Sequence, residues 1–432
     1  MILGVLYLLI EGLCQIFITP LLLKSYPSGD VGLWMVVTNF LVLIQLGQAG
    51  LAPISVRALA SASMAGGGAW DTEYKLVARA YSAACVLLAI ILICVAFYIA
   101  NVAARVGYHS WRMLWVFVAV GMLLRMYSWR WLSALNALGY VGMDKTLAIV
   151  NSILCYGAYA GIAVMHMPLT ILGGAYAALG GVYLILSYLI FRRYCNIRGN
   201  ALEQSGSVQV PGLPEVDRTL RTYALESARF LVLNASGFLV LNVDVVIVER
   251  IFGASVVPYF SILVKLGFLV LSVATLTQSM SYPFVAREWA GGNRTNARKI
   301  YRIGLAISLG IVVVGIGTLL VSAPVLIRHW LGAGSYLGTS VFATQLLFVL
   351  ISAHTIAQAT PALATGEVHF TDLAVWSAAL AVPLSWILGV ALGLPGVGLG
   401  NALGTIVPSV LHGLRAHRLF NREKSREVLP SL

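Results

Sequence analysis

The sequence predicts an all-α polytopic membrane protein with twelve transmembrane helices, in two six-helix lobes related by a pseudo-twofold axis along the membrane normal. Three observations predict this fold. The 432 residues are 59% hydrophobic and 10% charged, with a mean hydropathy of +0.89, whereas soluble domains carry about 25% charged residues. Apolar runs of about 20 residues, the length that crosses a bilayer as a helix, recur along the chain. The two halves also resemble each other at a steady offset.

Each predicted helix is an apolar run that ends at a polar turn. The first run lacks the basic start and small-residue cleavage site of a signal peptide, so we interpret it as a retained transmembrane helix. The expected spans are 1–24, 31–56, 76–100, 110–138, 145–166, 168–193, 223–250, 255–286, 301–323, 341–364, 372–393 and 396–416.

A long polar gap divides the chain near its middle. It contains GNALEQSGSVQVPGLPEVDR, and its Gly, Ser and Pro content is typical of a linker. We therefore expect an N-lobe over residues 1–194, a cytoplasmic linker over 195–222, a C-lobe over 223–418 and a cytoplasmic basic tail over 419–432.

The repeat is clearest in the stretch 26–60, whose pattern returns at 252–290, about 226 positions later. The GGAYAALGG run that follows Pro168 also matches the GVGLGNALG run after Pro395. Six crossings per half give both halves the same orientation, which places the expected symmetry axis along the membrane normal.

Basic residues predict the orientation of the chain. Lys and Arg accumulate in cytoplasmic loops, and most of the 28 basic residues fall on one side if both termini are cytoplasmic. This bias explains the net charge of +12, so no nucleic-acid partner is expected. The five cysteines form no CxxC pair, and we expect neither a disulfide nor a metal site. No cofactor is expected.

Several strings resemble one known family: GDVGLW, LIQLGQAGLAPISVRALA, NVDVVIVERIFGASVVPYFSILVKL, YPFVAREWAGGN and LPGVGLGNALGTIV. They are similar to the polysaccharide (O-antigen type) flippases of the multidrug/oligosaccharidyl-lipid/polysaccharide exporter superfamily. The resemblance covers the chain from about residue 4. Its motifs are mostly packing motifs, which specify a fold better than a chemistry.

The resemblance implies a flippase for surface polysaccharide assembly. Such a protein moves a polyprenyl-diphosphate-linked oligosaccharide from the cytoplasmic to the periplasmic leaflet by alternating access, in the bacterial inner membrane. The implied partners are this glycan lipid, membrane lipid, a coupling H+ or Na+, and a polysaccharide polymerase with its chain-length regulator. The alternatives are a cation-coupled multidrug exporter of the same superfamily and a non-transporting scaffold of a polysaccharide synthase complex.

An anionic diphosphate needs basic groups, and ionisable groups at membrane depth cost about 2.5 kcal/mol or more each. Arg125 and Arg130 lie about 140° apart on a helix, so at most one is expected to line a central cavity. The alternative for these residues is snorkelling or the cytoplasmic charge bias. The full set of expected diphosphate contacts is Arg57, Arg125, Arg130, Lys265 and Arg287.

Amides and imidazole suit the sugar part, and we expect Gln45, Gln48, His354 and Gln358 to contact it. Hydrogen bonds between helices are the alternative use of these groups.

Carboxylates at membrane depth suit ion coupling, for which Glu11 and Asp244 are the candidates. The alternative is a structural pairing, for Glu11 with a neighbouring basic residue and for Asp244 with Arg250.

The remaining patterns concern packing and enzyme motifs. Glycine spacings at Gly157/Gly161, Gly389/Gly393 and Gly396/Gly400/Gly404 predict close helix packing. The sequence has no GxSxG, HExxH or P-loop motif, which argues against an enzyme and against an ATP-driven pump. Transport energy is therefore expected from an ion gradient or from substrate supply.

Overall fold

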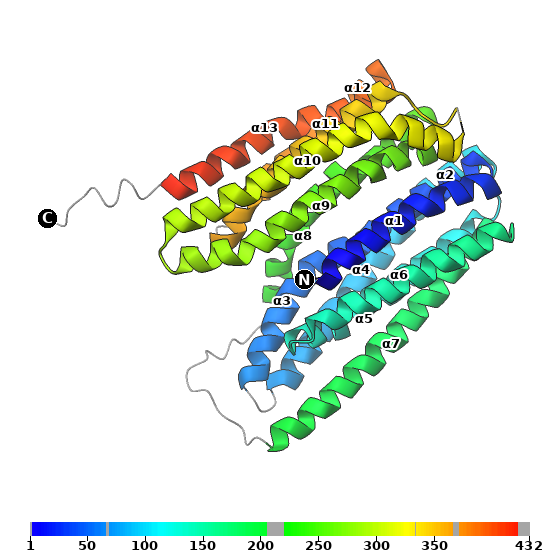
Figure 1. The fold of residues 1–432 in the computed structure, drawn as a ribbon. Coiled ribbons are helices and arrows are strands. Elements are labelled where there is room, and N and C mark those ends of the chain that lie inside the picture. The colour runs from blue at the N-terminus through cyan, green and yellow to red at the C-terminus, as the bar shows by residue number, and fades with distance from the viewer. Residues whose placement is uncertain (1, 66–68, 205–219, 333, 366–370, 422–432) are drawn as a thin grey trace. The chain divides into compact units, whose positions relative to one another are not determined.

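The structure is a computed structural model that describes residues 2–65, 69–204, 220–332, 334–365 and 371–421 (Figure 1). Over these residues the regular elements are all α-helices. Their bounds are α1 Ile2–Ser25, α2 Ser28–Asn39, α3 Val42–Ala65, α4 Ala69–Val106, α5 Trp111–Ala137, α6 Val141–Val164, α7 Leu169–Gln204, α8 Leu220–Phe252, α9 Val257–Ala290, α10 Arg294–Leu331, α11 Thr339–Thr365, α12 Thr371–Leu392 and α13 Leu394–Asn421.

The expected second span is two helices rather than one. The α-helical pattern breaks at Phe40 and Leu41, whose N–H groups donate to Val37 and Thr38 at 3.2 and 3.0 Å in tighter i→i+3 bonds. No Pro or Gly stands at this break. The Phe40 ring packs edge-on against Trp115, so tertiary contact at a bulky aromatic side chain accompanies the break.

Several helices extend beyond the apolar runs. Helices α4 and α10 each have 38 residues, which is roughly 57 Å at 1.5 Å per residue and longer than a bilayer core. Helix α10 begins in polar sequence, where the Asn293 side chain caps it by accepting from the Asn296 N–H at 3.2 Å. Helix α7 continues to Gln204, inside the expected linker, because residues 201–204 are mostly good helix formers.

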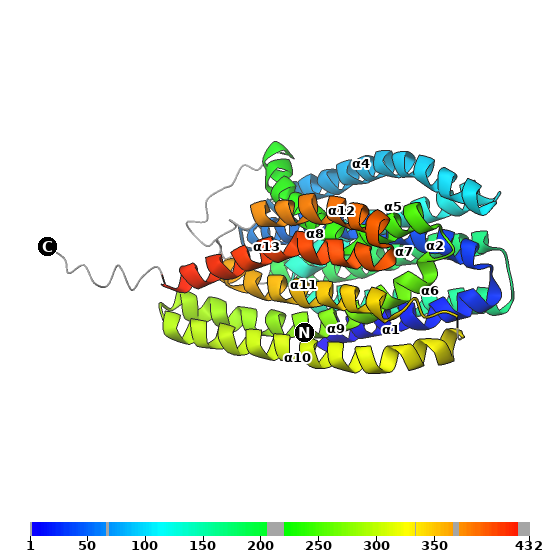
Figure 2. The ribbon, with the colours of Figure 1, turned by 90° about the horizontal axis from the view of Figure 1, so that it is seen from above.

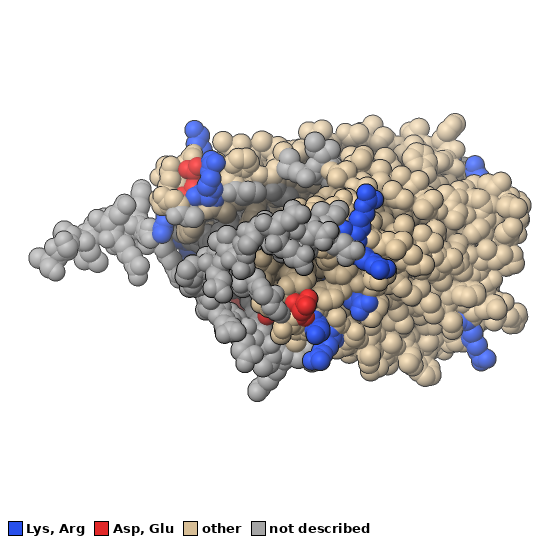
Figure 3. Space-filling model, turned by 90° about the horizontal axis from the view of Figure 1, so that it is seen from below, with Lys and Arg blue, Asp and Glu red and all other residues tan. Residues whose placement is uncertain are grey.

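Ten helical segments in the described ranges are long and apolar enough to cross a membrane, with α2 and α3 counted together. Helices α1 and α5 are not among them, and α5 carries Arg112, Arg125 and Arg130. Large apolar side chains face outward, with Phe97 71% and Val321 79% exposed; such a surface fits lipid. Figure 3 shows one face that is mostly uncharged, with Lys and Arg in separate groups. The chain is a multi-pass membrane protein, and the count of twelve spans stays a prediction.

The chain divides into two compact units, Met1–Ala235 and Ser236–Leu432. Within each unit, long helices run side by side (Figures 1 and 2). The order of neighbours is shared: α3, α4 and α5 contact one another as α9, α10 and α11 do, and α7 contacts α5 and α6 as α13 contacts α11 and α12. The unit boundary lies within α8, whereas the expected lobes end at a linker whose centre lies outside the described residues. The lobe boundaries and the symmetry axis stay predictions.

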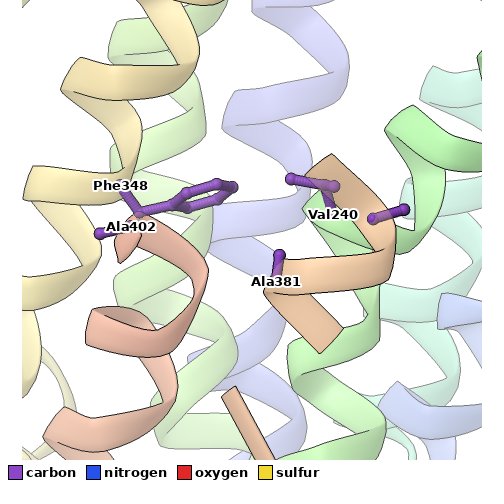
Figure 4. Packing of buried hydrophobic residues seen from close by; sticks show 5 residues of the cluster. Val240, Phe348, Ala381 and Ala402 are labelled. Carbon is purple, nitrogen blue, oxygen red and sulfur yellow. The ribbon is translucent and has the colours of Figure 1, made fainter. Parts of the chain in front are cut away.

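Small residues bring the helices of the second unit together. Val240 of α8, Phe348 of α11, Ala381 of α12 and Ala402 of α13 form one buried cluster (Figure 4). Gly404 lies against α12 there, because an added Cβ would stand 2.3 Å from the Ala381 Cα. Close packing at this glycine run is as the spacing predicts.

The same inference is wrong for the Gly157/Gly161 pair and for Gly393, whereas Gly389 packs closely, because an added Cβ there would stand 3.0 Å from Val397 Cγ2 of α13. An added Cβ at Gly157 or Gly161 would meet nothing within 4 Å, so this pair packs against no described atom. Gly393 has a φ of 75° and forms the turn between α12 and α13 instead of a helix contact. A glycine spacing shows that small residues share one face of a helix. It does not show which way that face points or where the helix ends.

Candidate functional site

Arg125 is the most deeply engaged cation of the first unit. It lies on α5, and its side chain is directed at α6 and α7. Its Nη1 donates to the Tyr176 carbonyl at 2.9 Å, and its Nη2 lies 3.4 Å from both Asn151 Oδ1 and Cys155 Sγ. The guanidinium also lies 3.8 Å from the centre of the Tyr176 ring. The residue is buried and has no carboxylate partner among these contacts.

An aromatic path leads from Arg125 toward Glu11. Tyr156 and Tyr159 of α6 meet edge to face with ring centres 5.9 Å apart, and Tyr159 meets Trp34 of α2 at 5.4 Å. Glu11 of α1 accepts from Gln15 Nε2 at 3.5 Å, one helical turn away as the sequence predicts. Tyr7 also hydrogen-bonds the half-buried carboxylate, and Lys145 of α6 lies near enough to act on its charge. Its expected ion-coupling role stays a prediction.

Arg130 points elsewhere on α5. Its guanidinium lies 3.9 Å from the Tyr127 ring centre and 4.2 Å from that of Trp131. The two arginines thus engage different neighbours, as their angular separation on the helix requires. Arg130 stacks within the aromatic surface of its own helix, which is the arrangement that favours a guanidinium over an ammonium.

The other three predicted cations differ in setting. Lys265 is half-buried on α9 and forms no ion pair with a described carboxylate. Arg57 is exposed on α3. The Arg287 side chain is 74% exposed near the end of α9 and lies 3.4 Å from Glu288 Oε1. The structure therefore leaves Lys265 uncommitted and places Arg57 and Arg287 where a solvated anion can reach them.

The two glutamines of α3 do not share one environment. Gln45 is exposed and Gln48 is half-buried. Ser55 lies farther along α3 and is fully buried, and its hydroxyl has no hydrogen-bond partner within the described residues. The contact of Gln45 and Gln48 with a glycan stays a prediction.

Asp244 lies at the centre of a buried polar group in the second unit, which we call the carboxylate cluster: Asp244, Gln345 and Asn401. Asp244 Oδ2 accepts from Asn401 Nδ2 at 2.8 Å, and the same amide donates to the Val240 carbonyl at 3.0 Å. Asp244 Oδ1, Asn401 Oδ1 and Gln345 Nε2 have no partner within hydrogen-bond distance among the described groups. Two unpartnered buried oxygens in one cluster are acceptors for a proton or a cation.

The expected pairing of Asp244 with Arg250 is wrong. Six positions on one helix turn the second side chain to a different face, about 120° away. Arg250 is accordingly exposed, whereas Asp244 is buried.

His354 and Gln358 belong to a second polar group of this unit, which we call the histidine chain: Tyr301, Gln358, His354 and Ser409. Gln358 Nε2 lies 3.0 Å from His354 Nε2, and His354 Nδ1 lies 2.8 Å from Ser409 Oγ. The Tyr301 hydroxyl donates to Gln358 Oε1. The structure thus joins the two predicted residues to each other and to α10 and α13. Their contact with a glycan stays a prediction.

The sequence did not reveal which residues hydrogen-bond to Arg125, Asp244 and His354. Tyr176, Asn401 and Ser409 all stand in apolar runs of helices α7 and α13, where a polar residue is itself a signal of a buried hydrogen bond. Asn401 lies inside the GVGLGNALG run. The glycine spacing of this run indicates helix packing and does not indicate the role of the amide.

Comparison with known proteins identifies which solved structures share this fold. No protein-family model matches the chain, and no curated protein matches it. Among solved structures, the lipid II flippase MurJ in an inward closed conformation has a TM-score of 0.71 at 11% identity, over 98% of this chain and 89% of that one. A mutant of the Vibrio cholerae MATE transporter VcmN has a TM-score of 0.64 at 16% identity, over 97% and 95%.

A multidrug resistance MATE family transporter of the MOP superfamily, in an inward-facing conformation, gives a TM-score of 0.61 at 16% identity over 97% and 95% of the two chains. These identities are too low to carry an activity from one chain to another. The structural likeness does confirm the fold expected from the sequence, while the O-antigen branch stays a prediction. The chain has the fold that MATE transporters and the lipid II flippase MurJ share.

Proposed function

We propose that this protein is a flippase for a polyprenyl-diphosphate-linked oligosaccharide, located in the bacterial inner membrane with both termini in the cytoplasm. The observation that carries the proposal is its likeness, over nearly the whole chain, to a protein that flips lipid II. The charge of the membrane helices supports an anionic cargo. Arg125, Arg130 and Lys265 have no described ion pair, whereas Glu11 and Asp244 are the carboxylates singled out at membrane depth.

The cations divide into two roles under this proposal. Arg57 and Arg287 are exposed and make the first contact with the diphosphate, because a guanidinium matches phosphate oxygens in a bidentate manner. Lys265 is uncommitted and half-buried, and it holds the anion deeper in the membrane. Arg125 already donates to a carbonyl and stacks on Tyr176. Its two terminal nitrogens already contact Gly121, Tyr176, Asn151 and Cys155, so under this proposal it contributes positive potential and rigidity rather than a direct hydrogen bond to the cargo.

The carboxylates supply the coupling. Asp244 is surrounded by the neutral amides of Gln345 and Asn401, and Glu11 accepts from Gln15 with Tyr7 and Lys145 close by. Each is suited to take up H+ or Na+ and to release it when the helices rearrange. Export of the glycan lipid by alternating access then draws on an ion gradient.

A cation-coupled multidrug exporter is the second candidate, favoured by the likeness to a multidrug resistance MATE family transporter. An organic cation would need carboxylates where it binds. Among the residues singled out at membrane depth, the cations without a described ion pair (Arg125, Arg130 and Lys265) outnumber such carboxylates (Glu11 and Asp244), so the flippase is the better account.

The decisive experiment deletes the gene and measures lipid-linked oligosaccharide on each leaflet together with surface polysaccharide. The expected result is accumulation on the cytoplasmic leaflet and loss of surface polysaccharide, restored by the wild-type gene. Complementation with Lys265→Gln is expected to restore export poorly, whereas Lys265→Arg and the control Lys24→Gln restore it. Lys24 is a matched control because it is an exposed lysine at the end of α1. Normal surface polysaccharide in the deletion strain refutes the flippase.

A further inference from the structure

The histidine chain crosses three helices of the second unit without a carboxylate. It starts at Tyr301 of α10, passes through Gln358 and His354 of α11 and ends at Ser409 of α13. Tyr301, Gln358 and Ser409 are buried, whereas His354 is half-buried. The imidazole is therefore enclosed by fixed polar groups but keeps an exposed edge through which a proton can exchange.

With the Gln358 amide oriented as in the structure, the donors and acceptors of the chain select one neutral form of His354. Gln358 Oε1 accepts from the Tyr301 hydroxyl, so the Gln358 amide nitrogen faces His354 Nε2. An amide nitrogen only donates, and Nε2 must then be the unprotonated nitrogen. Nδ1 carries the hydrogen and donates to Ser409 Oγ. Every hydrogen bond in this arrangement has one donor and one acceptor.

The same four residues also accommodate the charged form. When a proton adds to Nε2, rotation of the Gln358 amide by half a turn presents Oε1 as its acceptor. The amide nitrogen then donates to the Tyr301 oxygen, and the hydroxyl hydrogen of Tyr301 turns away. Ser409 Oγ still accepts from Nδ1. An imidazolium thus finds an acceptor on each side, without any ion pair and without an unsatisfied donor on the ring.

Charged and titratable groups near His354 oppose the presence of a second charged histidine beside it. From α13, His412 faces the imidazole, and Arg415 stands one turn beyond it in a bidentate pair with Asp372 of α12 at 2.9 and 2.7 Å. From α10, Arg302 lies beside Tyr301. From α9, the contacts near Ala353 are the apolar Leu271 and Ala274. A charge on His412 and a charge on His354 repel each other, so charging of either ring makes the other harder to charge.

We infer that His354 is a proton-binding residue of the transport cycle, and that its charging is relayed to α10 by the turn of the Gln358 amide. The inference rests on the proposed function for the transport step alone, because proton binding is a property of the isolated protein. The bound ligand is a proton from the aqueous phase, and no other co-reactant takes part.

The test is NMR of the full-length protein in nanodiscs with 15N-labelled histidine, recorded from about pH 5 to pH 8, the range in which histidine normally changes charge. The chain has seven histidines, and His354→Gln assigns the His354 signals. We expect a neutral Nδ1–H form that becomes doubly protonated within this range. Exposed His109 and His166 serve as internal references.

Ser409→Ala probes how the polar neighbours stabilise the charged ring, because it removes the acceptor of Nδ1. At the pH where half of His354 is charged in the wild type, we expect at least a threefold lower charged fraction in this variant, because a hydrogen bond to a charged group is lost. Ser61→Ala is the control, since the Ser61 hydroxyl bonds only to its own helix at Arg57. A His354 that stays neutral throughout, or one that charges equally in Ser409→Ala, overturns the inference.

Export links the proton to transport. His354→Gln places a polar amide where the imidazole ring stands, and an amide binds no proton in this pH range. We expect this variant to insert normally and to export surface polysaccharide at less than a tenth of the wild-type level. Full export by this variant overturns the coupling role. If the deletion strain shows normal polysaccharide while His354 still titrates, the flippase function fails and the proton site stands.

Discussion

Replacing Gly404 by alanine tests how α12 and α13 pack. The added Cβ would lie 2.3 Å from the Ala381 Cα and 2.4 Å from the Ala381 nitrogen. These are backbone atoms in the middle of a helix, and no side-chain rotation relieves the clash. The helices must therefore separate locally by roughly 1 Å before the contacts become ordinary.

The energetic cost follows from what that separation disturbs. Ala381 and Ala402 belong to the buried cluster with Phe348 (Figure 4), so moving α13 opens contacts on both sides of it. Overpacking of this kind costs about 1–3 kcal/mol, and the higher helix propensity of alanine returns up to about 1 kcal/mol. We expect a net loss of about 1.5 kcal/mol, which lowers the Tm of a 432-residue chain by about 2 °C.

The assay is thermal unfolding of purified protein in detergent, followed by circular dichroism. The matched control is Gly157→Ala, a glycine within a helix of the first unit where an added Cβ meets nothing within 4 Å. Helix propensity alone acts there, and we expect the Tm to be unchanged or slightly raised. Equal melting of the Gly404→Ala and Gly157→Ala proteins would refute the close packing of α12 and α13.

Three further predictions concern single side chains. Arg125→Met removes the donor to Tyr176 and Asn151 and is expected to lower stability by about 1–2 kcal/mol, with Arg125→Lys in between; chemical unfolding in detergent measures both. Asp244→Asn keeps an oxygen for the Asn401 amide, so we expect normal folding but export that no longer responds to the ion gradient in membrane vesicles. His166 has a φ of 50°, and His166→Gly is expected to raise the Tm, since a left-handed residue costs roughly 1 kcal/mol.

Hydropathy was sufficient to locate the helices. The expected spans each contain a helix because an apolar run of membrane length satisfies its backbone hydrogen bonds internally, whatever its neighbours are. The break at Phe40 is the exception. Neither Pro nor Gly announces it in the sequence, and the packing of the Phe40 ring against Trp115 is a contact between distant segments.

The hydrogen bonds of the polar groups could be predicted within a helix but not between helices. Glu11 with Gln15 and His354 with Gln358 were predictable as pairs, because four residues make one turn of a helix. The links to Asn401, Ser409 and Tyr176 were not, since each joins helices whose rotation about their axes is set by packing.

Glycine packing and polar bonding are connected in the second unit, and this connection explains why its polar groups are so fully enclosed. An added Cβ at Gly413 would lie 3.6 Å from both Gln358 and His354, an ordinary contact distance, so alanine would fit there but a larger side chain would meet the histidine chain. Ser409 stands one turn before Gly413 and accepts from His354 Nδ1 across the same narrow gap. A bulkier residue at 413 would push α13 away from α11 and lengthen the Ser409–His354 contact. The small residue is therefore a condition for the polar contact, and a sequence pattern for the site must include both.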